Sequence, residues 1–252
     1  MIQEKIALIT GGSRGLGRDM ALNVARKGLH VVLTYHANKE AAEQVVSEIQ
    51  NFGAQALALQ LDTSAVSTFD SFFSALPQHL ETAFGTSGID YLVNNAGTGH
   101  HALIADTTEE GFDEMLNIHF KGVYFFTQKM LPMLNDGGGI VNISSGLARF
   151  SFPGFAAYAS MKGAVEVFTR YLAKELGGRK INANVVAPGA VATDFAGGAN
   201  RDGARKDIIA GVTAMGRVGE ATDIGSIVAF LCTDEANWIT AQRIEASGGT
   251  LI

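Results

Sequence analysis

Tyr158 and Lys162 are the residues of this sequence best suited to moving a proton, because they stand four apart in a run typical of a helix. Residues at that spacing lie on the same helix face. A free tyrosine has a pKa of about 10 and exchanges its proton poorly near neutral pH. A lysine ammonium nearby stabilises the phenolate, so we expect Lys162 to lower the pKa of Tyr158. Many helices carry such a pair by chance, and the pair therefore needs support elsewhere in the chain.

Ser145 gives that support, since it follows the apolar run 140–143 and precedes Tyr158 by thirteen positions. A hydroxyl at the end of a strand can contact a substrate oxygen, although the neighbouring Ser144 offers the same group. Reduction of a carbonyl group requires a hydride at the carbon and a proton at the oxygen. We predict that Tyr158 transfers this proton, assisted by Lys162 and Ser145.

A glycine-rich turn, residues 10–17, lies between the first apolar run and the first helical stretch. Glycines let the backbone turn tightly and approach a pyrophosphate, while the start of the helix offers free N–H groups and a positive dipole end. At this place in the chain the turn predicts a dinucleotide site. The residues predicted to contact the dinucleotide here are Gly11, Ser13, Arg14, Gly15, Leu16 and Gly17.

Short apolar runs alternate with longer helical stretches along the whole chain. The runs cover 6–9, 31–33, 56–59, 91–93, 140–143 and 183–186, with a last one around Ile244. They are continuous rather than alternating, which is typical of strands buried on both faces. The pattern predicts an α/β fold: a single-domain, doubly wound parallel sheet (Rossmann-like) with helices on both faces, spanning residues 1–252.

Two stretches depart from this regular pattern. The helical stretch 69–84 contains Pro77, where we expect a kink or a break. The stretch from about 194 to 217 is the least regular and is rich in glycine. A mobile segment over a substrate site has such a composition, and so has a plain surface loop; we predict a substrate lid.

Taken together, the Thr-Gly-x-x-x-Gly-x-Gly turn, Ser145 and the Tyr158/Lys162 pair resemble the compact form of the short-chain dehydrogenase/reductases. The resemblance covers essentially the whole chain. It implies that Asn117 completes the catalytic group by holding a water that contacts Lys162 and relays protons. Further cofactor contacts implied by the resemblance are Asp62 at the adenine, Asn94, Ala96 and Gly97 beside the cofactor, Tyr158 and Lys162, and Pro188, Gly189, Val191 and Thr193 at the nicotinamide.

The end of the second apolar run predicts which dinucleotide is used. An acid at this place binds the ribose hydroxyls of NAD and repels the extra phosphate of NADP. Here the run continues into residues 34–39 without an Asp or Glu, while Arg14, His36 and Asn38 offer hydrogen-bond donors. Several donors without an acid suit a dianionic phosphate, and we predict NADP(H) as the cofactor.

The predicted substrate pocket is mostly apolar, as suits a hydrophobic carbonyl compound. Its walls are predicted to include Ser145, Leu147, Phe155, Tyr158 and Phe195. The adjacent histidines His100 and His101 do not share a helix face, and we predict no metal site.

The predicted activity is NADP(H)-dependent interconversion of a ketone or aldehyde and an alcohol. Related enoyl reductases typically place six residues between the tyrosine and the lysine, whereas three stand here. One alternative is a 3-oxoacyl thioester reductase of lipid synthesis, for which a basic patch would be needed to meet an acidic carrier protein. Arg149, Arg201, Arg205 and Lys206 would supply one. Another alternative is a dinucleotide-binding regulator without catalysis.

Composition limits the partners and the location. The chain has a net charge of −6 and no basic run, so nucleic acid is not expected as a partner. No apolar run reaches the roughly 18 residues of a membrane helix, and the single cysteine, Cys232, fits a reducing, cytoplasmic location. Val167 and Tyr171 lie off the buried stripe of the Tyr158 helix, and with the resemblance they predict a homotetramer.

Overall fold

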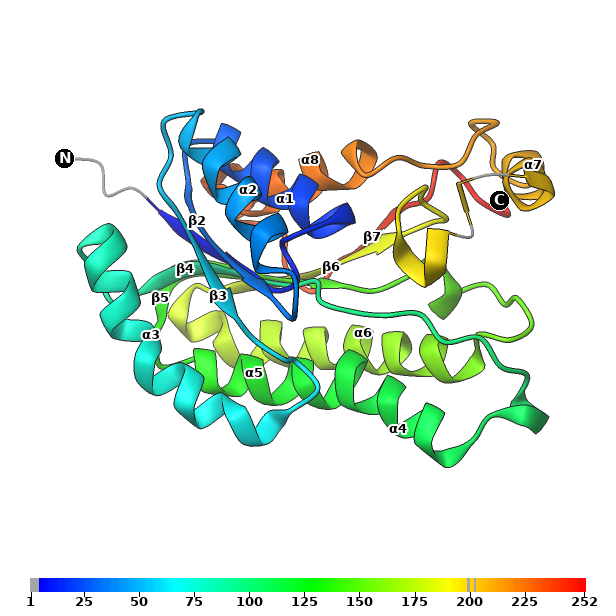
Figure 1. The fold of residues 1–252 in the computed structure, drawn as a ribbon, viewed down its shortest axis with the longest axis horizontal. Helices are drawn as coiled ribbons and strands as arrows, with labels where there is room; N and C mark the ends of the chain where they lie inside the picture. The colour runs from blue at the N-terminus through cyan, green and yellow to red at the C-terminus, as the bar shows by residue number, and fades with distance from the viewer. Residues whose placement is uncertain (1–4, 199, 202) are drawn as a thin grey trace.

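All seven strands belong to one parallel sheet, which confirms the predicted fold class (Figure 1). The computed structural model describes residues 5–198, 200–201 and 203–252, and the strand order is β3-β2-β1-β4-β5-β6-β7. The strands are β1 (Ile6–Ile9), β2 (His30–Tyr35), β3 (Ala56–Gln60), β4 (Ile89–Asn94), β5 (Leu134–Ile143), β6 (Asn182–Pro188) and β7 (Arg243–Ala246). Every predicted run therefore forms a strand.

Helices cover both faces of this sheet (Figure 1). One face carries α1 (Gly15–Arg26), α2 (Lys39–Gln50) and α8 (Thr222–Leu231). The other carries α3 (Phe69–Phe84), α4 (Glu109–Leu116), α5 (Gly122–Met130) and α6 (Ala156–Leu176). A further helix, α7 (Gly203–Gly211), lies beyond the carboxyl ends of the strands, close to the C-terminus. The two layers bury separate apolar clusters, one on each side of the sheet.

Pro77 does not break α3, which runs without interruption from Phe69 to Phe84. The predicted break is therefore wrong. A proline inside a helix costs about 3 kcal/mol because it removes an N–H and crowds the preceding turn. Phe69, Leu76 and Leu80 are fully buried against the sheet on both sides of the proline, and this packing holds the helix together.

The helical stretch after β4 contains a wider turn at its centre. Between α4 and α5 lies a π-helical turn, η3 (Asn117–Lys121), closed by a hydrogen bond from the Gly122 N–H to the Asn117 carbonyl. A Cβ at Gly122 would lie 2.0 Å from the Thr63 carbonyl oxygen, so this helix crosses the loop after β3 at backbone contact. Such turns often occur at functional sites.

The order of the strands sets the position of the site. The chain passes from β1 outward to β3 and then returns to β4 on the other side of β1. In open parallel sheets, ligands bind at the carboxyl ends of the strands where the order reverses in this way. The loops after β1 and β4 meet at that point. No helix within the described ranges is long and apolar enough to cross a membrane.

Candidate active site

A cavity of about 1270 Å³ lies at the carboxyl ends of the strands and gathers most of the predicted site residues. The predicted residues that line it are Gly11, Ser13, Arg14, Gly15, Leu16, Gly17, His36, Asn38, Asp62, Ala96, Gly97, Ser145, Leu147, Phe155, Tyr158, Lys162, Pro188, Gly189, Val191, Thr193 and Phe195. Asn94 and Asn117 are not part of the lining. The structure therefore brings all but two of the residues predicted from the sequence around one cavity.

The glycine turn is built for close backbone contact. Gly11 and Gly15 have φ values of 68° and 54°, in the left-handed region that favours glycine. A Cβ at Gly17 would lie 2.1 Å from the Gly11 carbonyl oxygen, so the start of α1 presses directly on the turn. The Asn95 amide nitrogen also lies 2.5 Å from this Cβ position, so the turn is closely packed, and the N-terminus of α1 opens toward the cavity. Both features fit the pyrophosphate of a dinucleotide.

Asn95, the residue after β4, holds the glycine turn to this neighbouring strand. The Asn95 amide donates to the carbonyls of Thr10 and Gly11 at 2.9 and 3.2 Å. Asn94 is buried in the other layer, where its amide donates to Thr127 and to Asn142 on β5. Consecutive residues of a strand point to opposite faces, so only one of the two can face the cavity. Asn95 lines the cavity and Asn94 does not, so the geometry does not support the predicted cofactor contact of the Asn94 side chain.

Charged and polar side chains gather beyond the glycine turn, after β2 and β3. Arg14 is exposed, and its guanidinium has no partner among the described residues. Asn38 caps α2 by accepting a hydrogen bond from the Ala41 N–H at 2.9 Å, as its position predicts, which leaves its amide N–H groups free to donate. Asp62 lies 3.7 Å from the His36 ring nitrogen. Partial burial opposes ionisation of Asp62, but hydrogen bonds from Ser64 and the nearby His36 hold its pKa below the usual value.

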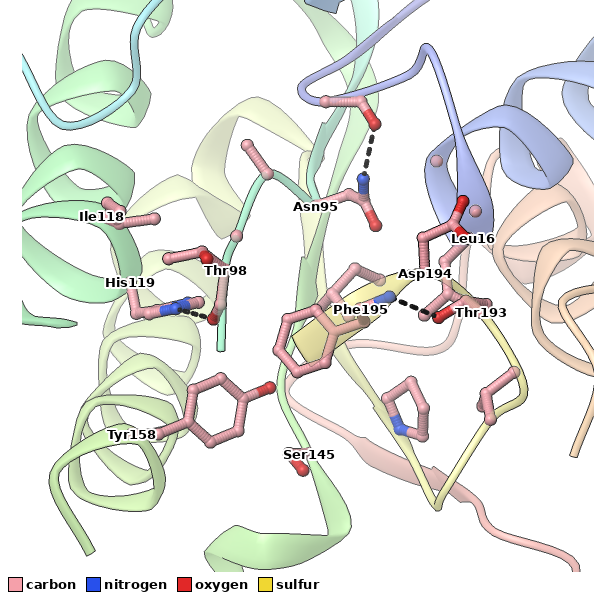
Figure 2. Close-up of a pocket in the computed structure, with 18 of the residues that line it drawn as sticks. Leu16, Asn95, Thr98, Ile118, His119, Ser145, Tyr158, Thr193, Asp194 and Phe195 are labelled. Atoms are coloured by element: carbon pink, nitrogen blue, oxygen red, sulfur yellow. Dashed lines mark hydrogen bonds between the residues drawn. The ribbon is translucent and has the colours of Figure 1, made fainter. Parts of the chain in front are cut away.

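The hydroxyl of Tyr158 points into the middle of the cavity, toward the space between Ser145 and Phe195 (Figure 2). The Ser145 oxygen accepts a hydrogen bond from the Leu147 N–H at 3.2 Å, which fixes its direction. Ser144 is buried, and its hydroxyl donates to the Glu166 carboxylate at 2.7 Å. Ser144 therefore supports the strand end, and Ser145 is the serine available to a substrate.

The electrostatic expectation for Tyr158 is not met. Burial raises the pKa of Tyr158 to about 12, although a hydrogen bond with Ser145 acts in the opposite direction. Burial also lowers the pKa of Lys162 to about 8. The Lys162 ammonium donates to the Ile143 carbonyl at 2.7 Å and lies 5.6 Å from the centre of the Tyr158 ring. The predicted lowering of the Tyr158 pKa is therefore wrong, because desolvation of the phenolate sets the direction of the shift.

His119, rather than Asn117, brings the helix after β4 to the catalytic group. At about 100° per residue, side chains two apart on a helix point in nearly opposite directions. Asn117 is the first residue of η3 and lies outside the cavity lining, whereas His119 is buried and lines it. Asn117 thus does not line the cavity, and its predicted role of holding a water at Lys162 stays a prediction. The sequence signal for His119 was weak: a histidine between two apolar residues, Ile118 and Phe120, of the helical stretch.

The loop after β6 also lines the cavity, through Pro188, Gly189, Val191 and Thr193. Val191 forms a bridge to Gly219, and the Thr193 hydroxyl accepts from the Phe195 N–H at 3.3 Å (Figure 2). A Cβ on Gly15 would lie 3.6 Å from Thr193, so this loop reaches back to the glycine turn. The loop therefore joins the phosphate end of the cavity to the catalytic residues.

Aromatic rings form much of the wall opposite the glycine turn. Phe195 lies 5.9 Å from the Tyr158 ring, and the His101 ring packs edge-on against Phe155 at 5.0 Å. Phe150 and Phe152, from the loop that also carries Leu147 and Phe155, line the cavity as well. Ile208, Ile209 and Val212 add apolar surface from α7 and the residue after it. Of the predicted lid, residues 199 and 202 lie outside the described residues.

Comparisons with known proteins show the family of this chain. The family described as "Enoyl-(Acyl carrier protein) reductase" matches residues 11–250. The "Short-chain type dehydrogenase/reductase" of Picea abies is 38% identical over 97% of this chain and 92% of its own. The crystal structure of the angucycline C-6 ketoreductase LanV with bound NADP has a TM-score of 0.93 at 35% identity, covering 98% and 95% of the two chains. The reductase LugOII, which catalyses keto-reduction at C1 during lugdunomycin biosynthesis, has a TM-score of 0.92 at 38% identity, covering 98% of each chain.

The chain therefore belongs to the short-chain dehydrogenase/reductase family and is an oxidoreductase. The cofactor of this family is a nicotinamide dinucleotide. The glycine turn, the loop after β6 and the Tyr158/Lys162 pair are the parts of this chain that fit such a group, because they line one continuous cavity.

Proposed function

We propose that this protein is an NADP(H)-dependent reductase of a ketone or aldehyde, with Tyr158 as the acid/base. The observation that carries the proposal is the meeting of Ser145, Tyr158 and Lys162 in the cavity that the glycine turn also borders. When bound, the nicotinamide supplies the hydride. The residues of this chain hold the carbonyl compound, deliver the proton and keep bulk water away.

The proton chemistry favours reduction of the substrate. With a pKa of about 12, Tyr158 is a neutral phenol at every working pH and is ready to donate its proton to a developing alkoxide. Ser145 is placed to hydrogen-bond to the same oxygen. Lys162, with a pKa of about 8, is mostly charged at neutral pH and stabilises the phenolate left behind. Above that pH it loses its charge, so we expect the reduction rate to fall.

The preference for NADP(H) rests on Arg14 in the glycine turn and on the groups after β2. Arg14 is exposed without a partner among the described residues, and His36 and Asn38 line the same end of the cavity. The acid found there, Asp62, is directed at Ser64 and His36. An unpaired guanidinium suits an extra phosphate, since charge-assisted hydrogen bonds to phosphate are among the strongest.

The aromatic walls favour a bulky, hydrophobic carbonyl compound. We also propose that the stretch from about 194 to 217 serves as the substrate lid within one domain of residues 1–252. Its far end is held by hydrogen bonds from the N–H groups of Ala214 and Met215 to the carbonyls of Gly249 and Gly248. Its near end contributes Phe195 to the cavity. A segment held at both ends can move as a flap over the substrate.

Two observations weigh against the alternative of a carrier-bound thioester. Arg149 pairs with Glu245 at 3.2 Å, and Arg201 pairs with Asp194 at 2.6 Å. Arg205 stacks over the Phe155 ring at 5.7 Å. Paired arginines attract an acidic partner less strongly, so a free small molecule is the better substrate. The intact catalytic group disfavours a regulator without activity.

We further propose a homotetramer in the cytoplasm. Tyr171 and Val167 are 64% and 46% exposed on α6, beside the catalytic helix face. Trp238, at the approach to β7, is 99% exposed. Apolar side chains this exposed suit contacts between subunits. Light scattering at several protein concentrations would measure the assembly, and a monomer at all of them would contradict it.

A panel of ketones and aldehydes assayed with NADPH tests the activity, with loss of the cofactor absorbance as the readout. Bulky aromatic ketones are expected to react faster than small aliphatic ones. If the protein reduced the C=C bond of enoyl compounds and not the C=O group of ketones, the proposed carbonyl reduction would be wrong. Binding of NADPH without turnover across the panel would favour the regulator.

A further inference from the structure

The environment of His119 is unlike that of any other histidine in the described residues. Its side chain is 1% exposed, lies in the π-helical turn and lines the catalytic cavity. Burial, followed by the charge of Lys162, lowers the pKa of His119 to about 3. The ring is therefore neutral at any working pH, and it carries one N–H and one bare nitrogen.

The hydrogen bonds of His119 decide which nitrogen carries the proton. Nε2 lies 2.8 Å from the Thr98 carbonyl oxygen, which can only accept, so Nε2 must carry the hydrogen (Figure 2). Nδ1 is then a bare acceptor. Within the described residues it is one of two buried side-chain nitrogens or oxygens without a partner. An orphaned acceptor at such depth is costly and marks a place where a hydrogen-bond donor belongs.

The available donor nearby is Lys162. The His119 and Tyr158 rings pack edge to face, with centroids 4.9 Å apart, and the Lys162 ammonium lies 5.6 Å from the same Tyr158 centroid. An ammonium has three N–H groups, and in the described part of the chain only the Ile143 carbonyl accepts one. The imidazole and the ammonium thus flank one phenol, each with hydrogen-bonding capacity to spare.

The space around Nδ1 is reserved by a glycine. A Cβ at Gly97 would lie 2.7 Å from Cε1 and 3.2 Å from Nδ1 of His119. Gly97 therefore leaves room for the imidazole beside the loop after β4, and the Nε2 bond to Thr98 holds the ring there. Gly97 and Thr98 both belong to the loop after β4. This loop and the π-helical turn η3, which carries His119, therefore fix the imidazole ring together.

We propose that His119 is a positioning residue for Lys162: its bare Nδ1 accepts a hydrogen bond, through one bound water, from the Lys162 ammonium. Since Nδ1 of His119 makes no direct hydrogen bond to the Lys162 ammonium, a water must bridge these two groups. The bond stabilises the charged form of Lys162 beside Tyr158, where a second cation would repel it. This inference rests on the proposed carbonyl reductase function, and its test therefore includes a measurement that needs no turnover.

Activity of three variants against pH is the first arm of the test. In His119→Phe the acceptor is lost, and the alkaline fall of kcat is expected to move to lower pH by about one unit. His119→Asn keeps a donor for Thr98 and an acceptor, so its profile should lie near the wild type. His79→Phe, on the exposed face of α3, is the matched control and should change nothing. A uniform loss of kcat in His119→Phe without a shifted limb would overturn the proposal, as would no change.

Nitrogen NMR of protein labelled in its histidines is the second arm, and it requires neither substrate nor catalysis. His119 is expected to show a protonated Nε2 and a hydrogen-bonded, unprotonated Nδ1 from pH 5 to 8. In Lys162→Met the Nδ1 signal should move toward that of an unbonded nitrogen. A ring that titrates within this range, or an Nδ1 signal indifferent to Lys162→Met, would overturn the proposal. Should the ketone panel fail while these signals appear as expected, the proposed function fails and the contact stands.

Discussion

The phosphate end of the cavity is formed by backbone, whereas the reaction end is formed by side chains. At the phosphate end, Gly11 and Gly17 meet at backbone contact, and the exposed Arg14 lies in the same turn. At the reaction end, three buried groups, His119, Tyr158 and Lys162, have strongly displaced pKa values. The phosphate end presents backbone N–H groups and the dipole of α1, whereas the reaction end presents titratable side chains that are buried away from water. The contrast suggests that binding and chemistry can be perturbed separately, and the following experiments test that separation.

Tyr158→Phe should give the largest effect, and only at the reaction end. We expect kcat to fall by about 10²- to 10⁴-fold, because the proton donor is lost while the ring remains. Binding of NADPH, followed by its fluorescence, should stay within about twofold since the phosphate end is untouched. Tyr124→Phe, on α5 and outside the cavity lining, is the control. Turnover that survives Tyr158→Phe would remove Tyr158 from the proton step.

Arg14→Ala should act at the phosphate end alone. The value of kcat/KM with NADPH is expected to fall by about 10- to 100-fold, since a hydrogen bond to a charged group is lost. The value with NADH should hardly change, as NADH lacks the extra phosphate. Arg26→Ala, at the far end of α1, where the guanidinium stacks on Phe52, provides the comparison. Equal losses with both cofactors would argue against a phosphate contact.

The free energy of unfolding should depend on pH through His119. The folded state holds its pKa at about 3, against 6.5 for a free histidine. Between these values the unfolded chain binds the extra proton, so acid favours unfolding. Below about pH 6.5 the wild type should lose up to about 1.4 kcal/mol per pH unit more than His119→Asn. Urea unfolding from pH 7 to 5 measures this, and parallel curves for the two proteins would contradict a buried, neutral His119.

Gly17→Ala and Gly163→Ala compare a glycine with no room for a side chain and a glycine with free space beside it. A Cβ at Gly17 would strike the Gly11 carbonyl at 2.1 Å, whereas nothing lies within 4 Å of one at Gly163 in α6. The first change should destabilise the fold by about 1–3 kcal/mol and weaken NADPH binding. The second should stabilise it by about 0.5–1 kcal/mol, because alanine is the better helix former. Thermal unfolding reports both, and a tolerated Gly17→Ala would show that the turn has room to shift.

Phe195→Ala should produce the smallest change, confined to the substrate. Its ring packs against Tyr158 and is 39% exposed, so its removal costs only part of an aromatic contact. The KM for a bulky aromatic ketone is expected to rise by about 2- to 10-fold, with kcat nearly unchanged. Phe52→Ala, far from the cavity lining, is the control. A large fall of kcat instead would mean that Phe195 also orients Tyr158.

Local sequence patterns determined the fold and the phosphate end. Continuous apolar runs such as 6–9 and 140–143 can bury both faces only inside a covered parallel sheet, and all of them form strands. The glycine spacing of residues 11–17 reflects backbone conformation, namely positive φ angles and positions that leave no room for a side chain. The turn could therefore be predicted from these residues alone, without knowing what packs against them. The same holds for Asn38, whose cap depends on the three residues that follow it.

Only the tertiary structure decided which neighbour faces the cavity and what burial does to it. The amide of Asn95, not that of Asn94, reaches the glycine turn, and His119, not Asn117, lines the cavity, because strand alternation and the π-helical turn set the direction of each side chain. The pKa of Tyr158 rises because desolvation depends on every element packed around the phenol, which no local spacing records. Local backbone geometry is carried within a few residues of sequence, whereas the environment of a buried charge comes from segments far apart along the chain.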